Sequence, residues 1–436
     1  MNKNQISIVI LAAGKGSRMK SPKAKVLHSI CGKEMLYYII KTSREISNDV
    51  TVVVAHQKEA VIESMSSYFN DINFVIQDAI NFPGTGGAMK NVSIKNERVL
   101  VLNGDMPLLE KNSLDGFLET KSDVVMSIFN LQNPNGYGRV IIENGEVKKI
   151  VEQKDATDEE LRVQSVNAGI YAFSKKVLEK YIPLLQNNNA QKEYYLTDVI
   201  SMATDDKIKI TPLLVNEEQF KGVNSKKDLS DAEIIMQEKI KNSLMESGVI
   251  MQLPSTIYIE EGVIFEGECI VENGCRITGK SKIINSHIKA HSVIEDSIVK
   301  SSDIGPLAHL RPASNIEDTH VGNFVEIKKS TLKGVKAGHL SYIGDATVDE
   351  GTNIGAGVIT CNYDGINKYK TTIGKNVFIG SDSQLIAPVT LEDNVMVAAG
   401  TTVRSGTIHS GELAASSSKL RVIKDFYYKF FSKKHS

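Results

Sequence analysis

The sequence has little of the material that marks several protein classes. Its four cysteines form no Cys-x-x-Cys pair, which argues against a disulfide framework and a zinc site and favours reduced thiols. A formal net charge of -1 gives no excess charge to attract nucleic acid or an anionic membrane. No apolar run is long enough to span a membrane, and the short run at 6–13 has only Lys3 ahead of it, so secretion is not expected. We therefore predict a cytoplasmic protein with no nucleic-acid partner and no stable membrane insertion.

What remains is the composition of an ordinary globular protein with more than one domain. The chain has 436 residues, too many for a single core, of which 24% are charged and 41% hydrophobic. An apolar stripe from Lys226 to Ser247, with a cap formed by Ser225 and Asp228, predicts a connecting helix. We expect domains at 1–225 and 251–420, a linker helix at 226–250 and a tail at 421–436.

The second half of the chain repeats an apolar residue at every sixth position, with small or turn-forming residues between. Neither a helix nor an alternating strand produces this period. A coil of three short strands does, and such coils stack into a parallel β-helix. A spacer or oligomerisation stalk without chemistry is the alternative role for such a stack. The unbroken run consists of Ile373, Ile379, Leu385, Leu391, Val397 and Val403.

The first half alternates apolar strands with helical patterns. The continuous apolar run at 7–11 is typical of a strand buried on both faces of a parallel sheet, and further strands are predicted at 51–54, 74–77 and 99–105. The alternation predicts a doubly wound, Rossmann-like α/β domain.

A glycine-rich loop follows the first predicted strand. Gly14 and Gly16 allow backbone amides to approach a phosphate closely, while Lys15 and Arg18 add positive charge. The loop matches neither a Walker loop nor a complete dinucleotide fingerprint. A glycine-rich turn without a ligand is the alternative.

Asp105 is the last residue of the strand predicted at 99–105. Ligands of such sheets bind beyond the carboxyl ends of the strands, so Asp105 is expected in the same crevice as Gly14. A carboxylate there suits Mg²⁺, which prefers oxygen ligands. A turn cap is the equally good alternative for an aspartate in this position.

Segments 11–19 and 25–27 resemble the signature of sugar-nucleotide pyrophosphorylases. With the hexapeptide repeats behind them, the chain from about residue 5 to about residue 415 is similar to the GlmU family. This is the family of bifunctional N-acetylglucosamine-1-phosphate uridylyltransferase/glucosamine-1-phosphate N-acetyltransferases, which serve peptidoglycan and lipopolysaccharide synthesis. The resemblance implies a doubly wound nucleotidyltransferase domain, a left-handed parallel β-helix and assembly as a homotrimer.

For the first domain, the resemblance implies a site for UTP and UDP-N-acetylglucosamine. Gln77 and the Gly84-Thr85 pair would read the uracil, and Asp105 with Asn224 would hold Mg²⁺. The segment 78–83 is longer than is usual in the family, and Gly87 stands where a histidine is common. The implied nucleotide and sugar residues are Leu11, Ala12, Ala13, Gly14, Lys25, Gln77, Gly84, Thr85, Asn103, Gly104, Gly138, Glu152, Asn167 and Asn224.

For the β-helix, the resemblance implies an acetyltransferase site with His339 as general base. Glucosamine must lose an ammonium proton before it attacks, and imidazole is suited to take that proton near neutral pH. The implied sugar-phosphate residues are Arg311, Lys328, Tyr342 and Asn353. The implied acetyl-CoA residues are Ala356, Asn362, Tyr363, Ser381 and Ala399. The usual arginine for coenzyme A phosphates is replaced by a Leu413 to Ser418 segment, with Lys419 or Arg421 as possible substitutes.

The sequence thus predicts acetylation of glucosamine-1-phosphate by acetyl-CoA, then UMP transfer from UTP, with release of pyrophosphate. Two alternatives stay open. One is a sugar-1-phosphate nucleotidyltransferase whose β-helix serves only assembly or regulation. The other is a non-catalytic scaffold.

Overall fold

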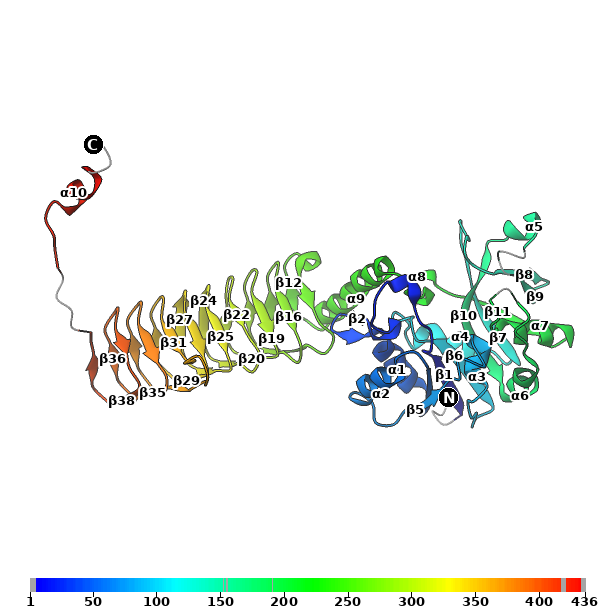
Figure 1. Cartoon of the computed structure of the whole chain (residues 1–436), viewed down its shortest axis with the longest axis horizontal. Coiled ribbons are helices and arrows are strands. Elements are labelled where there is room, and N and C mark those ends of the chain that lie inside the picture. Colours follow the sequence, from blue (N-terminus) through cyan, green and yellow to red (C-terminus); the bar gives the residue numbers. More distant parts are fainter. Residues whose placement is uncertain (1–4, 152, 154–155, 190, 417–420, 433–436) are drawn as a thin grey trace. The chain divides into compact units, whose positions relative to one another are not determined.

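The fold is known from a computed structural model, which describes residues 5–151, 153, 156–189, 191–416 and 421–432. The chain divides into two units, residues 1–238 and 239–436 (Figure 1). Within the described residues, no helix combines the length and apolar character needed to cross a membrane.

The first unit is built around a twisted sheet of mixed direction. The central strands pair in parallel, as the apolar runs predict, but β10 runs antiparallel to both β6 and β7. A hairpin of β8 and β9 extends from β10. In spatial order the main strands are β11 (Ile210–Leu214), β7 (Val124–Asn130), β10 (Ser165–Ser174), β6 (Arg98–Asn103), β1 (Ile6–Leu11), β4 (Asp49–Val54) and β5 (Asn73–Ile76). The smaller strands are β2 (Ser29–Ile30), β3 (Lys33–Glu34), β8 (Arg139–Glu143) and β9 (Glu146–Val151).

Helices cover both faces of this sheet, and two apolar cores result. Ile8 and Ile10 of β1 belong to one core, whereas Val9 belongs to the other. A strand buried on both faces explains the continuous apolar run, and the predicted doubly wound architecture is confirmed. The helices are α1 (Met35–Ile46), α2 (Lys58–Ser66), α3 (Thr85–Met89), α4 (Asp115–Glu119), α5 (Asp158–Leu161), α6 (Lys175–Tyr181), α7 (Thr197–Asp205) and α8 (Glu217–Phe220). Short 3₁₀ turns lie at Ser17–Met19, Lys25–Leu27, Asn112–Leu114 and Ile182–Leu184.

Helix α9 (Lys226–Glu246) runs across the boundary between the two units. It begins with a reciprocal cap, because Asp228 N donates to Ser225 Oγ at 3.1 Å and Ser225 N donates to Asp228 Oδ2 at 2.9 Å. Ala232 and Met236 are buried on its apolar side.

The second unit is a parallel β-helix. Every third strand in chain order joins the same sheet, so three sheets enclose one interior (Figure 1). The first sheet contains β12 (Ile250–Met251), β15 (Ile270–Val271), β18 (His287–Ile288), β21 (Asp303–Ile304), β24 (His320–Asn323), β27 (Lys336–His339), β30 (Asn353–Ile354), β33 (Phe378–Ile379), β36 (Met396–Val397) and β39 (Leu413–Ala414). The second contains β13 (Tyr258–Ile259), β16 (Arg276–Thr278), β19 (Val293–Glu295), β22 (His309–Leu310), β25 (Glu326–Lys328), β28 (Tyr342–Gly344), β31 (Ile359–Cys361), β34 (Gln384–Ile386) and β37 (Thr402–Val403). The third contains β14 (Ile264–Glu266), β17 (Lys282–Ile284), β20 (Ile298–Lys300), β23 (Asn315–Glu317), β26 (Thr331–Lys333), β29 (Ala346–Val348), β32 (Thr371–Ile373), β35 (Val389–Leu391) and β38 (Gly406–Ile408).

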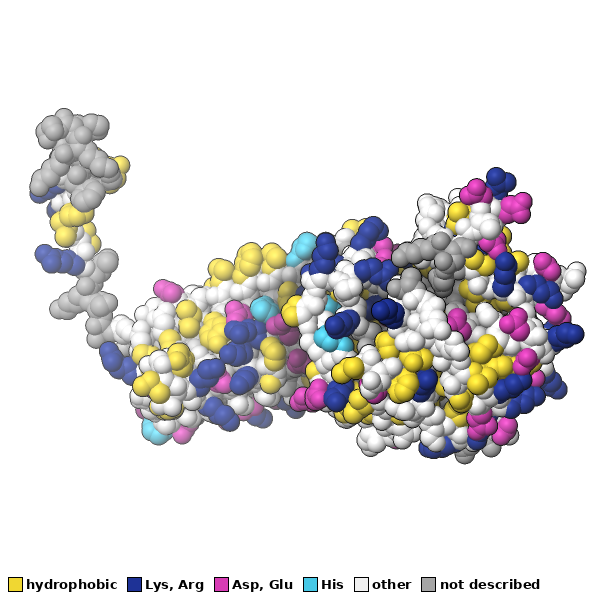
Figure 2. All heavy atoms as spheres, turned by 45° about the vertical axis from the view of Figure 1, so that its right-hand side comes forward, with side chains coloured by type: hydrophobic (Ala, Val, Ile, Leu, Met, Phe, Trp, Pro, Cys, Tyr) yellow, Lys and Arg dark blue, Asp and Glu magenta, His cyan; other side chains and the backbone are white. Residues whose placement is uncertain are grey.

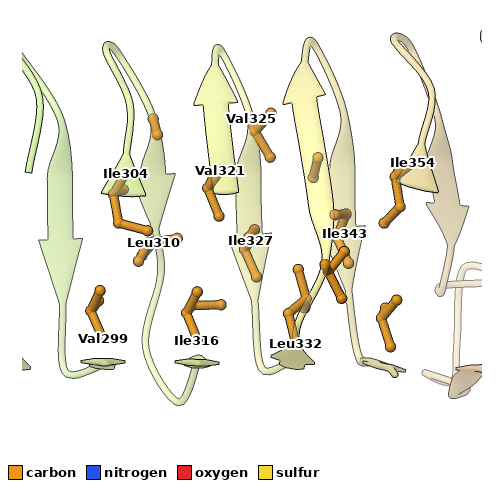
Figure 3. Close-up of a cluster of buried hydrophobic side chains, with 14 of the residues drawn as sticks. Val299, Ile304, Leu310, Ile316, Val321, Val325, Ile327, Leu332, Ile343 and Ile354 are labelled. Atoms are coloured by element: carbon orange, nitrogen blue, oxygen red, sulfur yellow. The ribbon is translucent and has the colours of Figure 1, made fainter. Parts of the chain in front are cut away.

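Aliphatic side chains of the short strands fill most of the interior of the β-helix. Figure 3 shows these side chains stacked from coil to coil, with Val299, Ile316 and Leu332 contributed by one sheet. The six residues of the unbroken six-residue period are all buried in this core. The β-helix prediction is therefore confirmed. Beyond it, the described tail contains helix α10 (Phe426–Ser432).

Candidate active sites

The first candidate site lies at the carboxyl ends of β1 and β6 in the first unit. A cavity of about 770 Å³ opens there, and a second of about 150 Å³ shares Asn103 and Asp105 with it. The larger cavity collects predicted residues from segments far apart in the sequence: Leu11, Ala12, Ala13, Gly14, Lys25, Gln77, Gly84, Thr85, Asn103 and Asp105. Ala12 N donates to Val53 O and Gly104 N donates to Leu11 O, both at 2.9 Å, so the loops after the strands are held by the sheet.

Lys25 lines the larger cavity and contacts two residues that line the smaller one, Asp105 and Asn224. Its Nζ forms an ion pair with Asp105 Oδ2 and donates to Asn224 Oδ1 at 2.6 Å. Arg18 Nη2 donates to the same Asn224 oxygen at 2.7 Å. Two cationic groups therefore meet the two oxygens that the sequence assigns to a metal.

These oxygens fit a magnesium ion. Both are oxygen donors of the kind Mg²⁺ prefers, and they already converge on one cationic atom. Gly222 gives them room, because a Cβ at that position would lie 3.3 Å from either Asp105 oxygen. Substrate phosphates and water would complete such a site, since the described residues contain no cluster of three metal-binding His, Cys, Asp or Glu side chains.

The smaller cavity has the apolar and polar mixture of a sugar site. Tyr137, Phe129 and Ala168 line it together with Gly222 and Asn224. Burial first, and then the charges of Glu217 and Asp228, raise the pKa of Tyr137, so its hydroxyl stays protonated.

Three of the predicted nucleotide and sugar residues that the structure describes line neither cavity, and a fourth is not described. The Asn167 side chain is engaged within β10, where Nδ2 donates to Tyr171 Oη at 2.6 Å and Oδ1 accepts from Gly169 N at 2.9 Å. Gly138 O accepts from Asn167 N at 3.2 Å, beside the cavity wall. Gly104 is buried under the loop, and Glu152 lies outside the described residues.

Sequence reasoning missed His56, Lys58 and Glu193, which also line the larger cavity. His56 and Lys58 follow β4, a parallel strand beside β1, so the rule that ligands bind beyond strand ends contained the signal. Glu193 carried no such signal, because it lies in an irregular segment.

The second candidate site lies on the β-helix. Residues at equivalent positions of successive coils stack there in a column. His339 ends β27 and pairs with Asn323 of the preceding coil. Ala356, Ser381 and Ala399 occupy the equivalent position in the next three coils. Asp382 N donates to Ala356 O at 2.7 Å and Gly400 N donates to Ser381 O at 2.8 Å, which fixes this register. A track of small side chains therefore leads away from His339.

A cationic cluster lies on the second sheet. Arg311 and Lys328 are neighbours in adjacent coils, since Arg311 N donates to Ile327 O at 2.8 Å. Repulsion by the nearby Lys368 ammonium, and to a smaller degree by Arg311, lowers the pKa of Lys328. Glu326 forms an ion pair with Arg311 at 2.9 Å, and Tyr342 stands next to Glu326 in the ladder. Such a cluster suits a phosphate, whose charge would relieve the repulsion.

Lys368 was missed in the sequence, although the loop that carries it was not. Asn362 anchors this loop, because its Nδ2 donates to Asp345 Oδ2 at 2.5 Å and its backbone oxygen accepts from Tyr369 N at 2.9 Å. Tyr363 is exposed, and it forms a backbone bridge with Lys368. A basic residue in a loop that leaves the β-helix coil was the signal in the sequence that could have identified Lys368 as a binding residue.

Asn353 is separated from the other predicted sugar-phosphate residues. It lies on the first sheet, whereas Arg311, Lys328 and Tyr342 lie on or next to strands of the second. A single β-helix therefore presents these four residues on two different faces. Lys419, the proposed substitute for the usual arginine, lies outside the described residues, and Arg421 is exposed in the tail.

Comparison with known proteins bears on both units. The model of the MobA-like NTP transferase domain matches residues 8–152, and that of the bacterial transferase hexapeptide, with six repeats, matches residues 370–405. The bifunctional protein GlmU of Sulfurimonas denitrificans is 87% identical over 434 residues, which cover 100% of both chains. That of Aliarcobacter butzleri is 59% identical, covering 98% of this chain and 99% of its own. That of Campylobacter jejuni is 52% identical, again covering 98% and 99%.

Proposed function

The chain belongs to the GlmU family of bifunctional enzymes, and we propose that it makes UDP-N-acetylglucosamine in two steps. It acetylates glucosamine-1-phosphate with acetyl-CoA and then transfers UMP from UTP to the N-acetylglucosamine-1-phosphate. The observation that carries the proposal is that one chain holds two separate clusters of matching chemistry, around Lys25 and around His339. The alternative in which the β-helix only assembles the enzyme leaves that second cluster unexplained.

We assign the two steps to separate regions of the chain. Residues 1–225 form the uridylyltransferase domain, 226–250 the connecting helix and 251–420 the acetyltransferase domain, while 421–436 form a tail. Because the two clusters lie in different regions, each reaction should be removable without the other.

In the acetyl transfer, His339 accepts a proton from the glucosamine ammonium, and the freed amine attacks the thioester carbonyl of acetyl-CoA. A C–N bond forms, the C–S bond breaks, and coenzyme A leaves as the thiol after protonation. Arg311, Lys328 and Lys368 hold the sugar phosphate. The track formed by Ala356, Ser381 and Ala399 offers backbone groups to acetyl-CoA and to the oxyanion.

In the uridylyl transfer, a phosphate oxygen of the sugar attacks the α-phosphorus of UTP, and the bond to the leaving pyrophosphate breaks. No protein nucleophile is needed. Lys25 and the amides of the Gly14 loop stabilise the charge that develops on the phosphate oxygens. Asp105 and Asn224 would hold Mg²⁺, which when bound supplies charge neutralisation at the phosphates.

Association of several copies completes the second site in this proposal. The hexapeptide repeats are consistent with association of copies, and we propose a homotrimer. Leu307, Phe324 and Leu340 occupy equivalent corners of three successive coils, each with positive φ and with 44–62% of its surface exposed. Large apolar side chains in a strained and exposed column are typical of an interface. In such an assembly, the first sheet of one copy, which carries Asn353, would lie next to the second sheet of a neighbouring copy, which carries Arg311.

Figure 2 shows hydrophobic, basic and acidic side chains intermixed on the visible face of the β-helix. The four cysteines form no disulfide, which supports the proposed cytoplasmic location.

The test is to assay the purified full chain for both reactions. Acetyl transfer is followed as coenzyme A release with glucosamine-1-phosphate, and uridylyl transfer as pyrophosphate release with N-acetylglucosamine-1-phosphate, UTP and Mg²⁺. We expect both. Uridylyl transfer alone would establish the single-function alternative, and neither reaction would favour the scaffold.

A further inference from the structure

The loop 78–83, which is longer than is usual in the family, has a defined structure beside Gln77. Asp78 organises it, since its Oδ1 accepts from Asn81 N at 3.1 Å and its backbone oxygen accepts from Phe82 N at 2.8 Å. The Asn81 side chain, whose Nδ2 donates to Asp78 Oδ2 at 2.7 Å, and then the Asn81 amide lower the pKa of Asp78. The bond from Phe82 N turns the chain back toward Gln77. The loop therefore brings the Phe82 carbonyl to the side chain of Gln77, which lines the larger cavity.

Two carbonyl groups hold the Gln77 amide in one orientation. Gln77 Nε2 donates to Phe82 O at 2.8 Å and to Gly84 O at 3.0 Å. Because carbonyl oxygens only accept, the amide nitrogen must face them. Gln77 is 8% exposed and lines the cavity, and among the described residues its Oε1 has no hydrogen-bond donor. The free acceptor is thus left for a ligand.

Gly87 explains why a side chain is excluded at this point. A Cβ on residue 87 would lie 2.1 Å from Phe82 O, closer than any real contact. The absence of the histidine common in the family is therefore the steric counterpart of the longer loop. Any larger residue would push the Phe82 carbonyl away from Gln77.

A cation between two aromatic rings holds Phe82 in place. Lys90 Nζ lies 4.3 Å from the centre of the Phe82 ring and 4.4 Å from that of Tyr194. The two rings are 5.7 Å apart, and Tyr194 N donates to Pro83 O at 2.9 Å. No acidic side chain among the described residues pairs with Lys90. This arrangement also gives a structural role to Tyr194.

We propose that Phe82, Gly87, Lys90 and Tyr194 are positioning residues that set nucleobase selectivity by fixing the orientation of the Gln77 amide. The proposal deepens the proposed function and rests on it. Oε1 is then the group that Gln77 offers to the ligand, and it accepts a hydrogen bond from a base with an N3–H donor, as uracil has. Cytosine presents a lone pair at N3 and is rejected. Reversing the amide would set Oε1 against two carbonyl oxygens, so the wild-type protein cannot adapt to cytosine at low cost.

The test compares kcat/KM for UTP, CTP and 5-methyl-UTP in the full-length protein. Gly87→Ala displaces the Phe82 carbonyl, and Lys90→Met removes the cation at similar length. The matched control is Lys33→Met, because Lys33 lies 4.6 Å from the Tyr68 ring, in a similar arrangement away from the cavity. Acetyl transfer in each preparation reports on the integrity of the protein.

We expect Gly87→Ala to lower the UTP-to-CTP ratio by about tenfold or more, and Lys90→Met by roughly threefold. Part of the change should be a gain with CTP, because the freed amide can turn its nitrogen toward N3. The ratio of UTP to 5-methyl-UTP should stay constant, and Lys33→Met should change none of the ratios.

Equal losses with UTP and CTP would show a merely structural role and overturn the proposal. So would an unchanged ratio in both variants, or a wild type that does not prefer UTP. If Gly87→Ala does not fold, Lys90→Met decides alone. A wild type inactive with all three nucleotides would instead refute the proposed function.

Discussion

The two units build their sites by opposite means. In the first, Lys25 meets Asp105 and Asn224, which are 80 and 199 residues away. In the second, Arg311 meets Glu326, which is 15 residues away and one coil further on. The sheet gathers distant segments at its strand ends, whereas the β-helix repeats one short coil and places chemistry by register. The first site depends on the whole tertiary fold, and the second on the stacking of adjacent coils.

The largest effect that separates the units is expected from His339→Ala. Loss of the general base should lower the rate of acetyl transfer by about 10²–10⁴-fold. Uridylyl transfer should not change, since its residues all belong to the other unit. The measurement is kcat for both reactions in one preparation. A parallel fall of uridylyl transfer would show that the two sites are not independent.

Asp105→Asn is the reciprocal experiment. It removes the charge that pairs with Lys25 and that would bind Mg²⁺, so uridylyl transfer should fall by about 10²–10³-fold, or about 3–4 kcal/mol of transition-state stabilisation. Acetyl transfer should be unaffected. Asp115→Asn, an exposed aspartate at the start of α4, is the matched control and should leave both activities intact. Equal rates for Asp105→Asn and the control would remove Asp105 from the mechanism.

A smaller effect should come from Lys368→Ala. Removing this ammonium relieves the repulsion that lowers the pKa of Lys328, but it also removes one of three cations from the phosphate site. We expect KM for glucosamine-1-phosphate to rise about tenfold, about 1.4 kcal/mol, with little change in kcat. Lys370→Ala, exposed at the end of the same loop, is the control. A change confined to kcat would contradict a binding role for Lys368.

The same contrast explains how much could be predicted from the sequence. In the β-helix, the period of six identified the buried positions directly, because each coil repeats the same local geometry. The column from His339 to Ala399 follows from that register. Which face Asn353 occupies does not, because the corners between the strands interrupt the simple count.

In the first unit, apolar runs predicted the strands and their carboxyl ends predicted the crevice. They did not predict that β10 would be antiparallel, since a strand buried on both faces has the same apolar pattern in either direction. Nor did they predict that the Phe82 and Gly84 carbonyls would hold the Gln77 amide. Its contacts join residues from three segments, and only the missing histidine at Gly87 hinted at them.

The smallest effect is expected for a contact that occurs in both units, an aspartate that accepts hydrogen bonds from backbone amides. Asp228 and Asp364 each accept hydrogen bonds from two backbone amides, but Asp228 caps α9 whereas Asp364 supports an exposed loop. Asp228→Ala should lower the free energy of unfolding by about 1 kcal/mol at pH 7. Asp364→Ala should not change it measurably, because that loop orders little of the fold.

The pH dependence distinguishes the cap from a packing effect. Burial opposes ionisation of Asp228, yet the amides of Asn224 and Ser225 lower its pKa below the ordinary value of 3.8. A carboxylate with a lowered folded pKa stabilises the protein above its unfolded pKa and loses that contribution as the pH falls through the folded value. In urea unfolding, the difference between wild type and Asp228→Ala should be complete at pH 7 and shrink below pH 3.8. A difference that persisted unchanged at acid pH would show that the variant loses packing and not the charged cap.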